Sequence, residues 1–141
     1  MIVLDTNVVS EIAHERTHPN VAEWVARQNR FELFLSVPVI AELAFGARRI
    51  LLRDKSQRYL VALDDLIAVE FRNRILPNDV ASALRFGDVY GRREAAGRPI
   101  GPMDAMIAAI CLVHDAKLAT RNVSDFDGLD LKLVNPFEAG A

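Results

Sequence analysis

The chain has 141 residues, of which 51% are hydrophobic and 26% are charged, and its formal net charge is −2 at pH 7. Because apolar residues are plentiful and only 7 Gly and 6 Pro occur, this composition predicts one compact domain over residues 1–141 and disfavours disorder or a collagen-like protein. The near balance of charges argues against a protein that coats DNA through bulk positive charge. A single cysteine, Cys111, excludes an intramolecular disulfide, and no apolar run approaches the ~20 residues that span a bilayer. We therefore expect a cytoplasmic protein.

The first half of the chain alternates between predicted strands and helices. Residues 2–4 are a short apolar run typical of a buried parallel strand, and the polar residues that follow are suited to cap a helix. Another strand is expected where apolar residues recur at 33–36. Between and after these strands, helices are predicted over residues 8–15, over 20–28, from Pro38 to a basic end that includes Arg53, and over 55–67.

The second half continues the same alternation. A short third strand ends at Pro77, and a helix capped by Asn78 or Asp79 runs through Ala96 to a stop at Gly97. The most apolar helix of the chain follows, and two more strands complete the pattern, so the remaining predictions are a helix over 103–114 and strands over 117–120 and 131–134. Strands that alternate with helices imply right-handed crossovers and a largely parallel sheet between two layers of helices.

Four carboxylates from distant segments fall at one edge of this predicted sheet. Asp5 ends the first strand, and Asp125 follows the fourth. Glu42 lies in the first turns of the helix after the second strand, and Asp104 in the first turn of the helix that leads to the fourth. Ligands of open parallel sheets bind outside the carboxyl ends of the strands, so we expect these four side chains to meet there.

Each acid has an ordinary alternative explanation as a helix cap, a residue that complements a helix dipole, a turn residue or a solvated charge. As a group they are harder to explain, because two carboxylates ~4 Å apart repel by ~4 kcal/mol at an effective dielectric constant near 20. Mg²⁺ or Mn²⁺ would offset this repulsion, and such ions support hydrolysis of phosphodiesters. Polar neighbours that would orient the acids, with capping as the equal alternative, are Thr6, Asn7, Thr120, Asn122 and Ser124.

Four stretches of the sequence, residues 2–11, 36–43, 97–105 and 118–126, resemble the PIN domain, in particular the VapC/FitB-like toxins of bacterial type II toxin–antitoxin modules. The likeness continues to the closing residues 133–137, and the order and spacing of the four motifs make it specific. It implies a three-layer α/β/α fold with a five-stranded, mostly parallel sheet in the order 3-2-1-4-5. It also implies a homodimer, and a heterotetramer or larger assembly with a small DNA-binding antitoxin that holds the protein inactive.

The activity that this resemblance implies is that of a Mg²⁺- or Mn²⁺-dependent endoribonuclease. Asp5, Glu42, Asp104 and Asp125 would be its catalytic and metal-binding residues. Basic residues are weighed separately, since for any single arginine a solvated charge at a helix end is the favoured interpretation. Because they flank motifs, Arg98 and Arg121 are the candidates for contact with RNA phosphates.

Other α/β enzymes fit the sequence less well. A haloacid-dehalogenase-like phosphatase needs a second Asp where Asn7 stands, and a receiver domain needs a Lys near its last strand, a role that Lys117 fits poorly. A dinucleotide site is unsupported because no Gly-rich turn follows the first strand. The serious alternative is a PIN-like module that binds RNA or a protein and cuts little. The homodimer rests on the resemblance and on apolar residues within 55–67.

Overall fold

In the computed structural model, which describes residues 1–141, five short strands form one sheet in the order β3-β2-β1-β4-β5. Every pair of neighbouring strands is parallel. This confirms the predicted α/β architecture and strand order. The strands are β1 (Ile2–Leu4), β2 (Leu33–Ser36), β3 (Ile75–Leu76), β4 (Lys117–Ala119) and β5 (Leu133–Val134).

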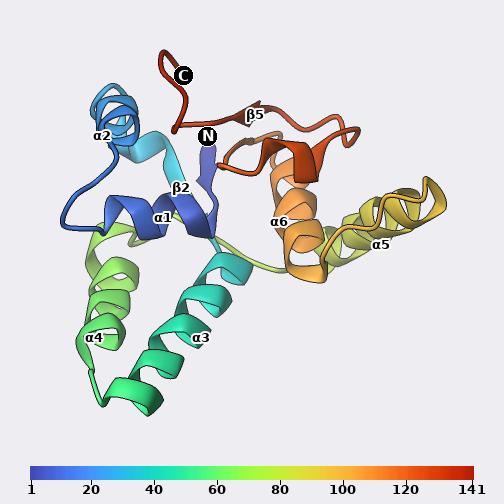
Figure 1. The fold of residues 1–141 in the computed structure, drawn as a ribbon. Helices are drawn as coiled ribbons and strands as arrows, with labels where there is room; N and C mark the ends of the chain where they lie inside the picture. Colours follow the sequence, from blue (N-terminus) through green and yellow to red (C-terminus); the bar gives the residue numbers. More distant parts are fainter.

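Six α-helices connect and cover these strands. In Figure 1, α3 and α4 form a hairpin that projects from the sheet, and α5 and α6 lie together on the other side of the molecule. The helices are α1 (Thr6–Ile12), α2 (Pro19–Ala26), α3 (Val37–Asp54), α4 (Arg58–Asp65), α5 (Val80–Ala95) and α6 (Pro102–Val113). Shorter helical turns are η1 (Arg30–Glu32), η2 (Leu66–Glu70) and η3 (Val123–Phe126). No helix has both the length and the apolar character needed to cross a membrane.

Several predicted elements have different boundaries in the structure. The strand expected over 131–134 is only Leu133–Val134, and the helices expected over 20–28 and 103–114 are shifted by one or two residues. The helix predicted over residues 55–67 was wrong at both ends, since α4 runs from Arg58 to Asp65. Its start is delayed because Lys55 adopts a left-handed conformation (φ 58°) that ends α3. After α4 the chain forms the π-helical turn η2. The helix predicted over residues 8–15 begins earlier, at Thr6, because Asp5 caps it directly, and it ends earlier, at Ile12. The break between α3 and α4 beside Lys55 was expected from the sequence.

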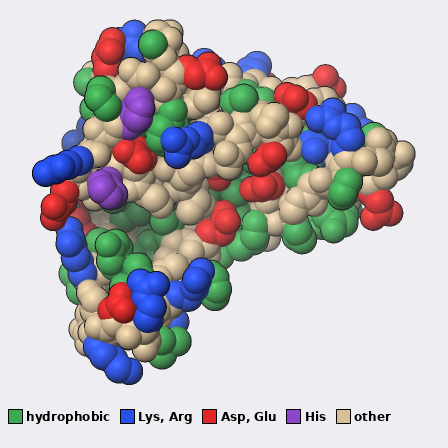
Figure 2. Space-filling view, in the orientation of Figure 1, with side chains coloured by type: hydrophobic (Ala, Val, Ile, Leu, Met, Phe, Trp, Pro, Cys, Tyr) green, Lys and Arg blue, Asp and Glu red, His purple; other side chains and the backbone are tan.

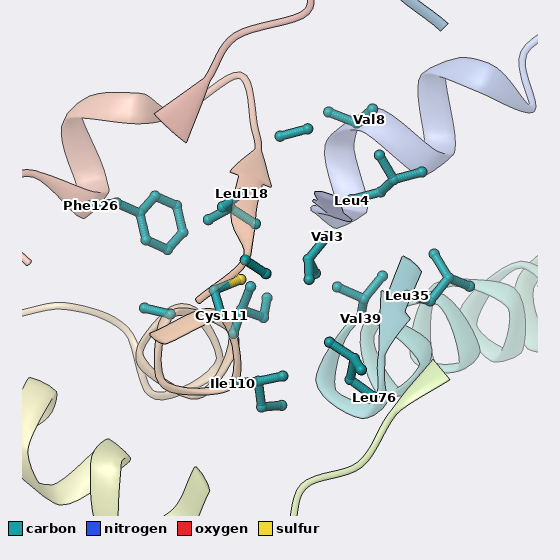
Figure 3. Close-up of a cluster of buried hydrophobic side chains, with 14 of the residues drawn as sticks. Val3, Leu4, Val8, Leu35, Val39, Leu76, Ile110, Cys111, Leu118 and Phe126 are labelled. Carbon is teal, nitrogen blue, oxygen red and sulfur yellow. The ribbon is translucent and has the colours of Figure 1, made fainter. Parts of the chain in front are cut away.

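The hydrophobic core lies between the sheet and α6. Val3 and Leu118, on adjacent strands, lie near Cys111 of α6 in Figure 3. The expectation that this helix is buried on more than one face is confirmed, since five consecutive residues, 107–111, are fully buried. Small side chains such as Ala108 let the helix approach the strands closely, which fixes the position of its first turn above the carboxyl edge of the sheet. Burial also raises the pKa of the Cys111 thiol, which therefore stays uncharged and packs as a small hydrophobic group.

Candidate active site

Asp5 joins the sheet to α1 at the centre of the carboxyl edge. Its backbone N–H donates to the Ala119 carbonyl at 2.9 Å, which continues the pairing of β1 with β4. Its Oδ1 accepts the backbone N–H of Thr6 at 2.8 Å, as an N-cap of α1. The residue is only 4% exposed. One aspartate therefore ends the strand and starts the helix, and its carboxylate is fixed relative to both.

The second oxygen of Asp5 is held by side chains from both ends of the sequence. Its Oδ2 accepts the Thr120 hydroxyl at 2.7 Å and the Asn7 amide at 3.1 Å. The Thr120 Oγ1 in turn accepts the backbone N–H of Asn122 at 3.0 Å, and the Asn7 Oδ1 accepts that of Arg121 at 3.1 Å. Hydrogen bonds to an ionised acceptor are stronger than neutral ones, so this network holds the carboxylate in one orientation.

Glu42 reaches the same edge from the second turn of α3. The Thr6 hydroxyl donates to the Glu42 Oε1 at 2.7 Å. Thr6 therefore contacts both acids, through its backbone N–H to Asp5 and through its hydroxyl to Glu42. The structure thus brings Thr6, Asn7 and Thr120 next to the predicted acids, whereas Asn122 contributes only its backbone N–H.

Asp104 lies in the first turn of α6 and is half-buried. Its pKa is raised to about 6, mainly because burial disfavours the charged form and then because Asp5, Glu42 and Asp125 are negatively charged. The carboxylates of Asp104 and Asp125 accept no hydrogen bond from the protein, and Asp125 is exposed in η3. The four acids thus form one electrostatic cluster in which Asp104 experiences the charge of the other three.

The four carboxylates offer only oxygen ligands, the donor type that Mg²⁺ and Mn²⁺ prefer. In donor chemistry they fit a hard divalent cation. In the arrangement of the structure, however, no three His, Cys, Asp or Glu side chains are placed to hold one ion together. Coordination by three or more of these acids therefore requires side-chain movement, for which Asp104 and Asp125 have no hydrogen bonds to break.

The two arginines predicted to contact RNA are both exposed and lie outside the acid cluster. The Arg98 guanidinium is 3.9 Å from an Asp127 carboxylate oxygen. The Arg121 guanidinium lies 4.5 Å from the centre of the Phe137 ring, in a cation–π contact. Neither side chain donates to any of the four acids.

Two buried polar residues near the site were not among the predicted site residues; Arg93 belongs to the arginines for which a solvated charge at a helix end was the favoured interpretation, and its burial corrects that interpretation. Arg93, which lies in a run of arginines at the end of α5, is buried and donates to backbone carbonyls that include that of Asp125. Ser36 ends β2 next to β1, and its hydroxyl is buried without a hydrogen-bond partner. A sequence signal was lacking for both, because an arginine run and a serine before a helix are ordinary features.

A cleft of about 1110 Å³ separates α1 from the hairpin of α3 and α4, with Thr6 and Glu42 on its wall. Figure 2 shows the hollow, with hydrophobic side chains inside it and Lys and Arg side chains around it. Leu43, Leu63 and Phe71 contribute to its apolar lining. The cleft is therefore an apolar surface that leads to the acid cluster.

Comparisons with known proteins define the class to which this fold and this acidic edge belong. A family model described as PIN domain matches residues 2–130. VapC ribonuclease Y4jK of Sinorhizobium fredii is 32% identical over 98% of this chain and 99% of its own length. Toxin FitB of Neisseria gonorrhoeae is 31% identical over 97% of this chain and 99% of its own length.

Among solved structures, a chain of FitAB bound to the IR36 DNA fragment superposes with a TM-score of 0.88 and 28% identity, covering 100% of this chain and 99% of that chain. The fold is that of an α/β PIN-type domain. The chain belongs to the PIN-domain family, among the relatives named VapC and FitB.

Proposed function

We propose that this protein is a Mg²⁺- or Mn²⁺-dependent endoribonuclease that acts as the toxin of a type II toxin–antitoxin module. The observation that carries the proposal is the cluster of four acids from distant segments, in which Asp104 experiences the charge of the other three. The relatives named VapC ribonuclease and Toxin FitB support the choice of RNA as substrate and of the biological role. Asp5, Glu42, Asp104 and Asp125 would be the catalytic and metal-binding residues.

Each acid would contribute differently. Asp5, held by three donors, would present a carboxylate with a fixed orientation. Thr6, which bonds both acids, would hold the Glu42 carboxylate close to that of Asp5. The carboxylate oxygens of Asp104 and Asp125 accept no hydrogen bond from the protein. These two side chains would turn toward the cation and complete its set of ligands. A bound divalent cation lowers the pKa of a water molecule and stabilises the charge that develops on a phosphodiester. Arg98 and Arg121 would hold RNA phosphates beside the acids, which alone repel a polyanion.

Cleavage of a labelled RNA by the purified protein tests this function. We expect cleavage with Mn²⁺ or Mg²⁺, none with excess EDTA, and a loss of about 10²-fold or more in Asp5→Asn, the order of effect typical of removing one preorganised electrostatic group. Asp127→Asn, an exposed acid in the same loop region as Asp125, is the matched control and should cut normally. Equal cleavage by Asp5→Asn and the parent protein would contradict the assignment.

We also propose that an antitoxin binds this protein and blocks the acid cluster. The solved FitAB complex supports such a partner. The cleft beside Glu42 offers an apolar surface for a segment of the antitoxin. If the adjacent gene encodes a small protein with a DNA-binding segment, its co-expression should give a stable complex in which cleavage is inhibited. A co-purified complex that cuts RNA at the full rate would contradict this role.

A homodimer is proposed as well, because large apolar side chains are exposed on the helices. Val61 on α4 and Leu84 on α5 are 63% and 75% exposed. Burying such side chains between two copies of the chain would remove apolar surface from water. Light scattering at micromolar concentration should give twice the chain mass of 15.7 kDa. A monomeric mass at that concentration would contradict the proposal.

The second candidate is a PIN-like module that binds RNA or a protein and cuts weakly. It is favoured by one observation, that no three of the acids are placed to hold one ion together. This function predicts RNA binding that is unchanged by EDTA and no cleavage at saturating Mn²⁺. The cleavage assay with Asp5→Asn therefore separates the two functions.

A further inference from the structure

Arg93 differs from the arginines around it. Its neighbour Arg92 pairs with Asp88 at 2.6 Å, and Arg98 lies 3.9 Å from Asp127, both on the exposed surface. Arg93 is only 7% exposed and forms no ion pair. A buried guanidinium without a carboxylate partner is costly unless its donors are satisfied, so its contacts need a specific explanation.

The Arg93 side chain binds only backbone carbonyls, and these belong to two separate segments. Its Nε donates to the Arg98 carbonyl at 2.7 Å. Its Nη1 donates to the carbonyls of Asp125 at 2.7 Å and Asp127 at 3.3 Å. The Arg98 N–H donates back to the Arg93 carbonyl at 2.9 Å, across a turn in which Gly97 has a φ of 69°. One guanidinium therefore joins the end of α5 to η3 and to the segment after Gly97.

Each of these two segments carries one acid of the cluster. The stretch that begins at Arg98 runs through the buried Ile100 to α6, where Asp104 lies in the first turn. The η3 turn contains Asp125 itself. These are the two acids that accept no hydrogen bond from the protein, so their positions depend on the backbone that carries them. Arg93 holds the backbone of both segments through its hydrogen bonds to their carbonyls.

We propose that Arg93 is a positioning residue of the candidate active site, which sets the spacing between Asp104 and Asp125 for a shared divalent cation. The inference rests on the proposed metal-dependent function. The planar guanidinium of Arg93 suits this role, because it directs N–H donors toward two segments at once, whereas a lysine ammonium is a single point charge. The positive charge also lies beside the main chain of an acid-carrying turn, where it counters the repulsion that would push that turn outward.

A purely structural role for Arg93 would lower stability and leave metal binding by the folded protein unchanged. The two roles are separated by measuring the Mn²⁺ dissociation constant by calorimetry and kcat and KM for RNA cleavage, below the unfolding temperature of each variant. Arg93→Met keeps the side-chain bulk and removes all three contacts. Arg93→Lys keeps the charge and can reach η3 while losing the contact with Arg98. Arg92→Met removes a neighbouring exposed arginine and is the matched control.

We expect the Mn²⁺ dissociation constant to rise by about 10- to 100-fold in Arg93→Met, the range typical of residues that orient metal ligands, with a smaller rise in Arg93→Lys and none in Arg92→Met. The loss in cleavage should fall on kcat at limiting Mn²⁺ and be reduced at saturating Mn²⁺, while KM for RNA changes little. The backbone amide NMR signals of Asp125 and Asp127 should shift in both Arg93 variants and stay in place in the control.

The outcomes distinguish this inference from the function on which it rests. A parent protein that neither binds Mn²⁺ nor cuts RNA overturns the proposed function. A parent protein that does both, beside an Arg93→Lys variant with unchanged Mn²⁺ affinity, overturns only the role of Arg93, whether or not the amide signals shift. If Arg93→Met does not fold, the smaller loss of Mn²⁺ affinity expected in Arg93→Lys still tests the role of Arg93.

Discussion

The acidic edge of the sheet has two halves that are built differently. Asp5 and Glu42 are held by side-chain and backbone donors, and Asp5 is almost fully buried. Asp104 and Asp125 accept no hydrogen bond, and Asp125 is exposed. The same kind of group is therefore fixed by local donors in one half and only by its backbone in the other.

This difference shows which half of the site carries the electrostatic repulsion among the four carboxylates. Donors lower the energy of an ionised carboxylate, so the Asp5 half is stable without a cation. In the other half, burial and the three neighbouring charges raise the pKa of Asp104 to about 6. We expect a divalent cation to change the second half more than the first.

Saturating Mn²⁺ should stabilise the folded protein most. At a concentration 100 times its dissociation constant, a ligand that binds only the folded state adds about 2.7 kcal/mol to the free energy of unfolding. Thermal unfolding with Mn²⁺ and with EDTA measures this gain, and Asp104→Asn should lose most of it. If Asp104→Asn gained as much as the parent protein, the second half would have no part in ion binding.

Thr120→Val should weaken the hydrogen-bond network that holds Asp5 while keeping the shape of the side chain. The variant removes the 2.7 Å hydrogen bond to the buried Asp5 carboxylate and should lower the free energy of unfolding by about 2 kcal/mol, as expected for a hydrogen bond to a charged group. Urea unfolding of Thr17→Val, which loses only a hydroxyl contact to the His14 carbonyl at the surface, is the control and should change little. A loss in Thr120→Val no larger than in Thr17→Val would show that the network does not stabilise the fold.

Asp104→Asn should have the opposite sign and stabilise the cation-free protein. The pKa of Asp104 is raised from its ordinary 3.8 to about 6, so the folded state binds a proton more tightly than the unfolded state. This contribution to stability is fully present below about pH 4 and is lost as the pH rises through 6. At pH 7 the variant should therefore gain about 1 kcal/mol, a figure reduced for solvent screening because the group is half-exposed.

The measurement for Asp104 is the difference in unfolding free energy between Asp104→Asn and the parent protein from pH 4 to pH 8 in EDTA. That difference should rise between pH 4 and pH 6 and then stay constant. Asp127→Asn should give a flat difference. A flat profile for Asp104→Asn would mean that neither burial nor the neighbouring acids raise the pKa of Asp104.

The smallest effect is expected at Ser36, whose buried hydroxyl has no partner. Ser36→Ala removes an unsatisfied group and should raise the free energy of unfolding by up to about 0.5 kcal/mol. Ser82→Ala is the matched variant, because the Ser82 hydroxyl is also buried but donates to Asp79 at 2.9 Å, and it should lose about 1 kcal/mol. Equal losses in both variants, measured by urea unfolding, would show that Ser36 has a partner in solution.

Local sequence patterns predicted most of the fold, because the features that define it lie within a few residues of each other. The apolar run 33–36 became β2 with the same boundaries, and Asp79 caps α5 as expected. The four acids were predicted to meet because they fall at the carboxyl ends of the predicted parallel strands, whereas the strand order itself came from the family resemblance. The end of α3 beside Lys55 was expected, but the start of α4 only at Arg58 was not, because the short connection between the two helices leaves no signal in apolar periodicity.

Other properties of the site depend on contacts that no local pattern contains. The acceptors of Arg93 include backbone carbonyls 32 and 34 positions later in the chain, and any residue supplies such a carbonyl. The raised pKa of Asp104 requires both its burial and its distance to three other charges. Sequence therefore identified the groups that carry charge and did not identify the residue that spaces them.

The central place of β1 in the sheet has a consequence for protein synthesis. Its first neighbour, β2, leaves the ribosome early, but its second neighbour begins only at Lys117, and the Asp5 carboxylate gains its Thr120 donor three residues later. A nascent chain that ends before this point lacks the last acid, Asp125, and one of the three donors that hold the Asp5 carboxylate. Contacts between segments this far apart in the sequence form late, so the complete set of four acids assembles only after Asp125 has been synthesised.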